Sequence, residues 1–435
     1  MNFSNVEVAE LLRELRKKFE GKRWFGSRKG KLNVLDFCLL YSTPSSYTFA
    51  TIFKVGEEEF FLPIFYKNGY VCEAEEKKKY YETLIKNFQK NKEILTMNGN
   101  KIIFKSNREM EGKLEKAELI NADTTNILSV LQIGGKKYFC KTYRLISQNL
   151  EPIFLLTLNK MHFKYSPKIF CSCEYKKKIV SIIEEYIENF GDCFSLFKKL
   201  LSEVINGDIE KEFESIKKAE EIGRIIAQMH NCIIASDDKI FSPEEIKKED
   251  VDRWKNWIFK NLSYCNKFLH ENTKKKIKTA IENISDYIGL IKTRTHQDLH
   301  LAQFIISRNK KFFILDFEGE PLRREGQKIE KLTPIRDIAT MIRSISYVKH
   351  AELKGNESKI ADLWEKKVAN AMLRSYLATV KEKKKVVGDR ELKKILNVWL
   401  LEKAIYEVKY ELKYRPEYVS IPLAGIKEIL DNGRD

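Results

Sequence analysis

The sequence predicts an α+β protein with two lobes: a mixed N-terminal part and a mostly helical C-terminal part. Three observations support this. Runs rich in β-branched and aromatic residues crowd the first part, apolar residues repeat at helical spacing in the second, and a chain of 435 residues that is 43% hydrophobic can bury such a core. We predict three segments, over residues 1–105, 106–190 and 191–435.

The first hundred residues contain helix and strand patterns in turn. Apolar spacing predicts a helix from Val6 to Phe19. Alternating runs predict strands over 46–55 and 57–66, and a charged stretch predicts a second helix from Glu73 to Asn91. These elements make a small α+β subdomain at the N-terminus.

Two β-rich runs around Gly134 and Gly135 predict a hairpin. The runs are NILSVLQI and KKYFCKTYR, and Lys141 lies near the end of the second. The Thr- and Asn-rich turn before the first run, with Thr125, could close over a phosphate group. A lysine on such a strand could grip that phosphate.

Beyond this lobe the pattern becomes helical. The run IVSIIEEYIENFGD predicts a strand that continues into a linker, whose backbone would meet a nucleotide base at Glu185, Tyr186 and Ile187. QFIIS and KFFILDF, on either side of a turn at 308–311, interrupt the helices and predict a second hairpin.

Charge and cysteine usage exclude several classes of function. The net charge of +17 comes from short lysine runs mixed with glutamate along the chain, without an RNP-like, KH-like or helix-turn-helix signature. The eight cysteines form no CxxC pair and are expected to be reduced core thiols. The sequence has no signal-peptide pattern and no apolar run of about 18 residues. We expect a cytoplasmic monomer or weak homo-oligomer that binds neither nucleic acid nor membrane.

The segment THQDLHLAQFIISRNKKFFILDFEGEP carries the most specific chemical signal. It sets His296, Asp298, Gln303 and Asp316 at the offsets of the protein-kinase catalytic loop and metal-binding hairpin. Phosphoryl transfer from Mg-ATP needs a carboxylate that orients the attacking hydroxyl and oxygen ligands for the metal. Turn capping by Asp298 and Asp316 is the plain alternative, but it does not explain the joint spacing.

The lysine that grips the phosphates needs an acidic partner in a kinase fold. Glu151 could pair with Lys141, although Pro152 and the apolar IFLLTL leave this pairing open. Asp337 could cap a helix or hold the catalytic loop, and capping is the commoner role. His230, at the end of an apolar helix, is expected in the core.

These motifs resemble those of the maltokinases, which are related to aminoglycoside phosphotransferases and have a protein-kinase-like fold. HQDLHLAQ, DFEGEP and RDIATMIRS follow in the family's order, KRWFGSRKGK resembles its capping subdomain, and LEKAIYEVKYELKYRPEYVSIPLAGI resembles its C-terminal helix. The match spans essentially the whole chain. Gln297 and Ala302 replace two family glycines, and a family Asn-Pro-Glu-x-Glu segment is reduced to NLEPI.

The resemblance implies phosphorylation of maltose by ATP and Mg²⁺ at the anomeric hydroxyl, within α-glucan and trehalose metabolism. Asp298 would be the base, Gln303 and Asp316 the magnesium ligands, with Glu318 as an auxiliary ligand, and Lys141 the phosphate-binding lysine. The segments would be a cap (1–105), a nucleotide-binding lobe (106–190) and a helical lobe (191–435). A kinase for glucosamine or glucose, or a catalytically silent kinase-like scaffold, stays an alternative.

The C-terminal helix is a candidate sugar platform. Tyr406 and Tyr410 share one face, and Glu407 and Glu411 form an adjacent row. Aromatic rings and charged groups are the side chains that bind sugars, but a packed amphipathic helix explains the same spacing. The resemblance favours a substrate site made of His296, Lys403, Tyr406, Glu407, Tyr410, Glu411 and Arg415, although His296 supports the loop in kinases.

Overall fold

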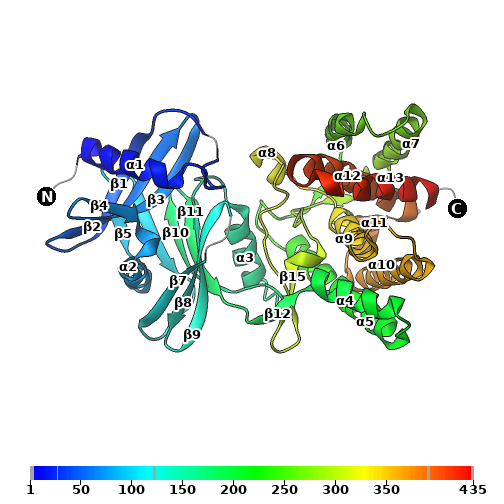
Figure 1. The fold of residues 1–435 in the computed structure, drawn as a ribbon, viewed down its shortest axis with the longest axis horizontal. Helices are drawn as coiled ribbons and strands as arrows, with labels where there is room; N and C mark the ends of the chain where they lie inside the picture. The colour runs from blue at the N-terminus through cyan, green and yellow to red at the C-terminus, as the bar shows by residue number, and fades with distance from the viewer. Residues whose placement is uncertain (1–3, 27, 121–123, 389–391, 433–435) are drawn as a thin grey trace. The chain divides into compact units, whose positions relative to one another are not determined.

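The computed structural model describes residues 4–26, 28–120, 124–388 and 392–432. The chain divides into two compact units (Figure 1). Unit 1 comprises 1–156 and 167–187, and unit 2 comprises 157–166 and 188–435. The predicted boundary after residue 105 falls inside unit 1, at the end of a strand, so the separate cap and nucleotide-binding segments stay a prediction.

Unit 1 begins with a helix on a four-stranded antiparallel sheet (Figure 1). Helix α1 (Asn5–Phe19) starts at a capping box between Ser4 and Glu7. Its apolar face packs on the sheet with Trp24 and Phe25 in an aromatic cluster. The strands, in sheet order, are β1 (Asn33–Ser42), β2 (Ser46–Val55), β3 (Glu58–Lys67) and β4 (Tyr70–Glu73).

The predicted helix from Glu73 to Asn91 is shorter in the structure. Helix α2 spans Lys78–Gln89, because Glu73 completes strand β4 and Ala74–Glu76 form a single 3₁₀ turn. The sequence pattern did not separate these charged residues from the helix. The helix at 6–19 and the strands at 46–55 and 57–66 are confirmed to within a few residues.

A seven-stranded antiparallel sheet forms the rest of unit 1, in the order β5-β6-β10-β11-β9-β8-β7. The predicted hairpin at Gly134 and Gly135 is confirmed, since both glycines have positive φ angles in the turn between β8 and β9. Helix α3 (Leu150–Lys160) follows β9. The strands are β5 (Glu93–Leu95), β6 (Lys101–Ser106), β7 (Leu114–Ile120), β8 (Asn126–Ile133), β9 (Lys136–Tyr143), β10 (Ile169–Tyr175) and β11 (Lys178–Glu185).

Unit 2 is mostly helical, as predicted. The second predicted hairpin is present as β15 (Phe304–Ser307) and β16 (Phe312–Ile314), and β12 (Asn189–Asp192) pairs with β15. A minor pair joins β13 (Glu244–Glu245) to β14 (Ile291–Lys292). The helices are α4 (Cys193–Ile205), α5 (Ile209–Ile234), α6 (Lys248–Leu262), α7 (Glu271–Glu282), α8 (Glu325–Lys328), α9 (Ile335–Leu353), α10 (Lys359–Thr379), α11 (Lys383–Val387), α12 (Leu392–Tyr414) and α13 (Ser420–Asn432).

Helix α12 is the central element of unit 2 and packs against α6, α7, α9 and α13. Its Trp399 is fully buried beside Trp254 of α6, with ring centroids 5.4 Å apart. Helices α5 and α10 run parallel, since Lys367 pairs with Glu212 and the Ser375 hydroxyl bonds to the backbone of Glu220. Helix α12 also contacts the catalytic loop, through Lys403 and Asp298.

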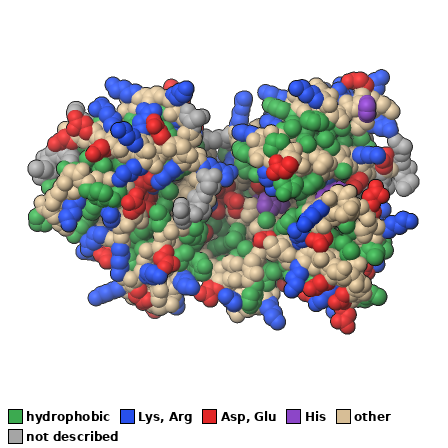
Figure 2. Space-filling model, in the orientation of Figure 1, with side chains coloured by type: hydrophobic (Ala, Val, Ile, Leu, Met, Phe, Trp, Pro, Cys, Tyr) green, Lys and Arg blue, Asp and Glu red, His purple; other side chains and the backbone are tan. Residues whose placement is uncertain are grey.

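Surface and core agree with the composition. Figure 2 shows Lys and Arg interspersed with Asp and Glu on the visible face, as expected for solvated helix faces. Seven of the eight cysteines are buried and Cys232 is half-buried, and all are free thiols. None of the helices described here is long and apolar enough to cross a membrane.

Candidate active site

Asp337, in the first turn of α9, holds the backbone of the predicted catalytic loop. Its carboxylate accepts hydrogen bonds from the amides of His296 at 2.8 Å and Gln297 at 3.0 Å. Burial alone would raise the pKa of Asp337, but these bonds and His230, whose Nε2 lies 3.2 Å away, keep it below its usual value. Capping is not the role observed, because Pro334 is the N-cap of α9 and no side chain caps it. His230 is buried, as expected.

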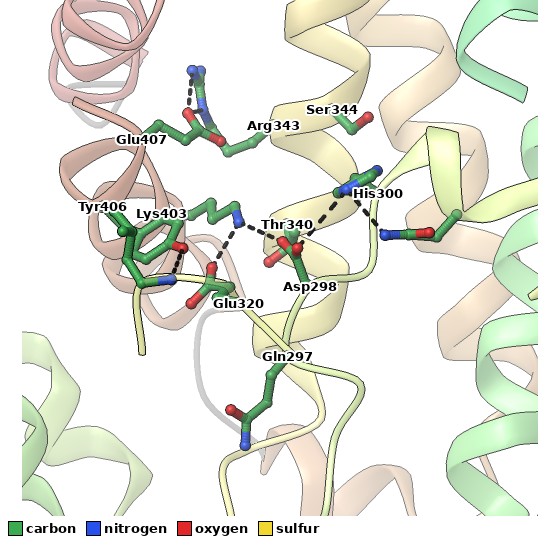
Figure 3. A network of polar contacts seen from close by, with 12 residues as sticks. Gln297, Asp298, His300, Glu320, Thr340, Arg343, Ser344, Lys403, Tyr406 and Glu407 are labelled. Carbon is green, nitrogen blue, oxygen red and sulfur yellow. Dashed lines mark hydrogen bonds and ion pairs between the residues drawn. The ribbon is translucent and has the colours of Figure 1, made fainter. Parts of the chain in front are cut away.

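Gln297 stands where the family that the sequence resembles has a glycine. Its backbone has a conformation that glycine favours. Its φ is +67°, in the left-handed region. The side-chain amide donates to the carbonyls of Lys328 at 3.1 Å and Glu330 at 2.9 Å, and Figure 3 shows it directed away from Asp298. The Gln297 side chain therefore anchors this left-handed turn to residues 328–330.

The β15–β16 hairpin brings Gln303 and Asp316 together, as predicted. The Gln303 Nε2 atom lies 3.1 Å from the Asp316 Oδ2 atom. Strand β16 ends at Ile314, two residues earlier than expected, and Asp316 sits in a turn with φ +61°. Glu318 is half-buried three residues before the motif's proline. The amide and carboxylate oxygens of Gln303 and Asp316 are donors that Mg²⁺ accepts.

His296 supports the loop and does not line the sugar site assigned to it. Its side chain is buried. Nε2 lies 3.0 Å from the Leu315 carbonyl, and the ring packs against Phe317 with centroids 4.7 Å apart. The ring therefore joins the catalytic loop to the segment after β16 and is not among the residues that line the cavity described next, and its assignment to the substrate stays a prediction.

A cavity of about 290 Å³ opens within unit 2 between the catalytic loop, α9 and α12. Six of the seven residues predicted for the sugar site line it together with Asp298. Tyr406 and Tyr410 stack within it, with ring centroids 6.5 Å apart and an interplanar angle of 26°. The lining residues are Phe194, Asp298, His300, Ala302, Pro321, Thr340, Ser344, Tyr347, Lys403, Tyr406, Glu407, Tyr410, Glu411 and Arg415.

Lys403 links the catalytic loop to α12 at the cavity wall (Figure 3). Its Nζ lies 3.2 Å from Asp298 Oδ1 and 2.6 Å from Glu320 Oε1. Burial alone would lower the pKa of Lys403, but these two carboxylates outweigh it and raise the pKa above the ordinary value. The ammonium is therefore charged beside Asp298 and fixes that carboxylate at the mouth of the cavity.

A buried ion network underlies Lys403. Glu320 also contacts Arg323, and it accepts from Arg336 at 2.8 Å. Glu402 of α12 accepts from Arg323 at 3.1 Å and from Arg336 at 2.9 Å. The pKa of Glu320 is held well below its usual value by these cations, which outweigh its burial. Arg336 also donates to the Gln297 carbonyl at 3.0 Å, so the network reaches the loop.

The two glutamates of α12 in the cavity each have an arginine partner. Glu407 Oε2 accepts from Arg343 Nε and Nη2 at 3.1 and 3.0 Å. Glu411 accepts from Arg415 at 2.8 and 3.0 Å and from the Tyr347 hydroxyl at 3.1 Å. Burial raises the pKa of both glutamates, and the arginines oppose it. The cavity thus offers paired charges and aromatic faces together.

Sequence reasoning missed several residues of this site. Glu320 lies in DFEGEP, and Arg336 and Arg343 lie in RDIATMIRS; both motifs carried the resemblance, but these three residues received no role. Their position in those motifs was the signal that could have marked them as site residues. His300, which lines the cavity, had the same signal because it lies in HQDLHLAQ, whereas Tyr347, which also lines it, lies in none of the quoted motifs.

The predicted nucleotide residues lie in unit 1. Lys141 on β9 pairs with Glu151 at 2.5 Å, and the Tyr143 hydroxyl donates to the same carboxylate at 2.7 Å. This confirms the pairing that the sequence left open, because Glu151 opens helix α3 directly after the sheet and Pro152 is tolerated in a first turn. A strand lysine paired with a helix glutamate is the arrangement of kinases.

The other residues predicted to contact the nucleotide lie just before β8 and at the end of β11 or after it. Thr125 is exposed before β8, and the turn residues 121–123 lie outside the described residues. Glu185 ends β11, and Tyr186 and Ile187 follow it as the expected linker. Their contact with a nucleotide stays a prediction.

Glucosamine kinases are among the known proteins to which this chain is similar. The chain matches no protein-family model. The glucosamine kinase of Mycolicibacterium smegmatis is 21% identical over 159 residues, which span 36% of this chain and only 39% of that protein. A solved glucosamine kinase in crystal form A has a TM-score of 0.73 at 13% identity, with 93% of each chain covered.

A glucosamine kinase solved with glucosamine, ADP and inorganic phosphate has a TM-score of 0.74 at 13% identity, with 96% of this chain and 98% of that chain covered. These likenesses show that the chain has the fold of glucosamine kinase over nearly its whole length. The kinase part of the sequence resemblance is supported, and its restriction to maltose stays a hypothesis.

Proposed function

We propose that this protein is an ATP-dependent sugar kinase and that the cavity in unit 2 receives the acceptor sugar. The observation that carries the proposal is the position of Asp298. Its carboxylate lines a cavity of stacked tyrosines and paired charges, and it lies on the same loop that ends at the Gln303–Asp316 pair. A proton acceptor thus lies on one loop with oxygen donors for a metal.

The chemistry follows from these residues. Asp298 orients the sugar hydroxyl and takes its proton as the oxygen attacks the γ-phosphorus of ATP, whose bond to the β-phosphate oxygen breaks to release ADP. Gln303 and Asp316 fit a hard divalent cation, and bound Mg²⁺ would screen the phosphate charge. Lys403 holds Asp298 in place, and Lys141 with Glu151 is the candidate for the phosphate grip.

The size of the cavity supports a single sugar ring as the acceptor. Its volume of about 290 Å³ is at the lower end of the roughly 300–1,000 Å³ usual for ligand sites. Glucosamine is the first candidate, because the relatives are glucosamine kinases. Maltose is the second, supported by the resemblance of the cavity helix, EKAIYEVKYE, to the maltokinase motif.

An ADP-release assay with Mg-ATP and glucosamine, glucose or maltose tests the proposal. We expect turnover with at least one sugar and loss of turnover when EDTA removes the metal, and mass spectrometry would identify the phosphorylated product. Turnover of a monosaccharide without turnover of maltose would show that the maltose hypothesis is wrong. Nucleotide binding without turnover of any of the three would instead favour the silent scaffold.

A further inference from the structure

Helix α13 comes close to Arg343 of α9 at Gly425, and the partner of Arg343, Glu407, lines the acceptor cavity. A methyl group added there would lie 2.1 Å from Nη1 of Arg343, 2.6 Å from Cζ and 2.7 Å from Nη2. Gly425 is buried and helical, without the positive φ that would demand glycine for its backbone. Glycine is a poor helix former, so the space for the arginine accounts for it.

Arg343 has little freedom to move aside. Its side chain is 3% exposed. Two of its nitrogens donate to one oxygen of Glu407, and Nη1 lies 3.4 Å from the Ser346 hydroxyl. Its guanidinium also lies 5.7 Å from the ring centroid of Tyr347, another cavity residue. In Figure 3 the arginine reaches Glu407 from α9, on the side opposite Lys403. Displacing the guanidinium breaks the contact that orients Glu407.

We propose that Gly425 is a positioning residue for the acceptor sugar, because it leaves the space in which Arg343 holds Glu407 at the cavity wall. The last helix then belongs to the acceptor site although none of its residues lines the cavity. Gly425 lies in the segment IPLAGI, which is part of the sequence resemblance but received no role there. This inference rests on the proposed sugar kinase activity.

A double-mutant cycle tests the inference on the sugar that the wild type phosphorylates best. Gly425→Ala should raise the KM for this sugar about 10-fold, as expected for loss of a charged hydrogen bond, with kcat and the KM for ATP nearly unchanged. Arg343→Lys removes the guanidinium that the methyl group would meet. Gly425→Ala should therefore add little in the Arg343→Lys background.

Gly223→Ala is the matched control. A methyl group there would lie 2.2 Å from the backbone oxygen of Met372, in the contact of α5 with α10. This variant should lower the melting temperature and leave the KM for the sugar unchanged. An unchanged KM for Gly425→Ala, or an equal effect of Gly425→Ala with Arg343 and with Lys at position 343, would overturn the inference.

Folding and activity can be separated in this design. If Gly425→Ala alone does not fold, a folded double variant supports the inference and an unfolded one contradicts it. If the wild type phosphorylates none of the sugars, the proposed function fails first. The melting temperatures of the wild type, Gly425→Ala, Arg343→Lys and the double variant then still report whether Gly425 and Arg343 are coupled, and additive effects on them would reject the contact itself.

Discussion

Asp298 is the residue on which the proposed chemistry depends. Its carboxylate lies 3.2 Å from the ammonium of Lys403 and 3.9 Å from Nε2 of His300. Because both neighbours come from elements that frame the cavity, the carboxylate has a fixed direction before any sugar binds. Such preorganisation is what a base in phosphoryl transfer requires.

Asp298→Asn should therefore abolish most turnover and leave ATP binding nearly intact. We expect kcat to fall about 100-fold or more, because the amide cannot accept the hydroxyl proton. Steady-state kinetics and nucleotide titration check this, with Asp252→Asn on the exposed face of α6 as the control. Turnover at the wild-type rate would reject Asp298 as the base.

Substitutions at Gln297 test the left-handed turn of the catalytic loop. Gln297→Gly fits a φ of +67° but loses two hydrogen bonds to the loop at 328–330, so activity should stay within a few-fold. Gln297→Val forces a β-branched residue into the left-handed region, at a cost of about 1–3 kcal/mol. The melting temperature of Gln297→Val should therefore be lower than that of Gln297→Gly. A valine variant as stable as the glycine variant would contradict this prediction.

Short elements and their termini assemble the site. The β15–β16 hairpin joins Gln303 to Asp316, and the first turn of α9 supplies Asp337 to the catalytic loop. The hairpin was predictable because its signals, two apolar runs and a turn, are local. For Asp337 the sequence left two roles open and favoured capping over holding the loop, because its partners His296 and Gln297 lie 41 and 40 residues earlier in the chain.

Asp337→Asn should destabilise unit 2 by about 1–3 kcal/mol, since one of the two loop amides loses its acceptor. The folded pKa of Asp337 is below its usual value. The charged group therefore stabilises the fold above the unfolded pKa of about 3.9, and this contribution is lost as the pH falls through the folded pKa.

Urea unfolding of the wild type and of Asp337→Asn, between neutral pH and pH 3, measures this. The free energy of unfolding should fall less steeply with acid in the variant than in the wild type or in Asp252→Asn. Equal slopes in all three proteins would show that Asp337 does not have the depressed pKa.

Across the whole molecule, the positive charges behind the net charge of +17 are distributed along the chain and mixed with acidic residues. Lysines pair with glutamates along helices, as in the Lys211–Glu214 and Lys274–Glu271 pairs, and Figure 2 shows both signs mixed on the visible face. Exposed pairs of this kind add little stability but keep the surface solvated.

We therefore predict no stable complex with RNA or DNA at physiological salt. A gel shift with a mixed-sequence duplex and single strand checks this, with a second lane at low salt, where weak electrostatic binding is expected for a basic protein. A complex that survives physiological salt would reopen the nucleic-acid alternative.

By itself, the sequence determined most of the elements and predicted the reacting groups. Local signals placed the hairpins, the helices and Asp298, Gln303, Asp316 and Lys141, because strand and helix patterns and turn chemistry act over a few residues. Motif order also indicated a kinase before any comparison. The sequence could not show that the His296 side chain packs against Leu315 and Phe317, because membership of a motif does not give the direction of a side chain.

Only the tertiary structure decided how the charges are paired. Arg336 reaches Glu402 across 66 residues and Arg343 reaches Glu407 across 64, and no spacing rule predicts such partners. Burial makes these pairings obligatory, since a charge in the interior without its partner is strongly unfavourable. The packing of α9, α12 and α13 therefore brings residues of separate motifs together around a cavity with the proposed base Asp298, paired glutamates and a glycine that leaves room for Arg343.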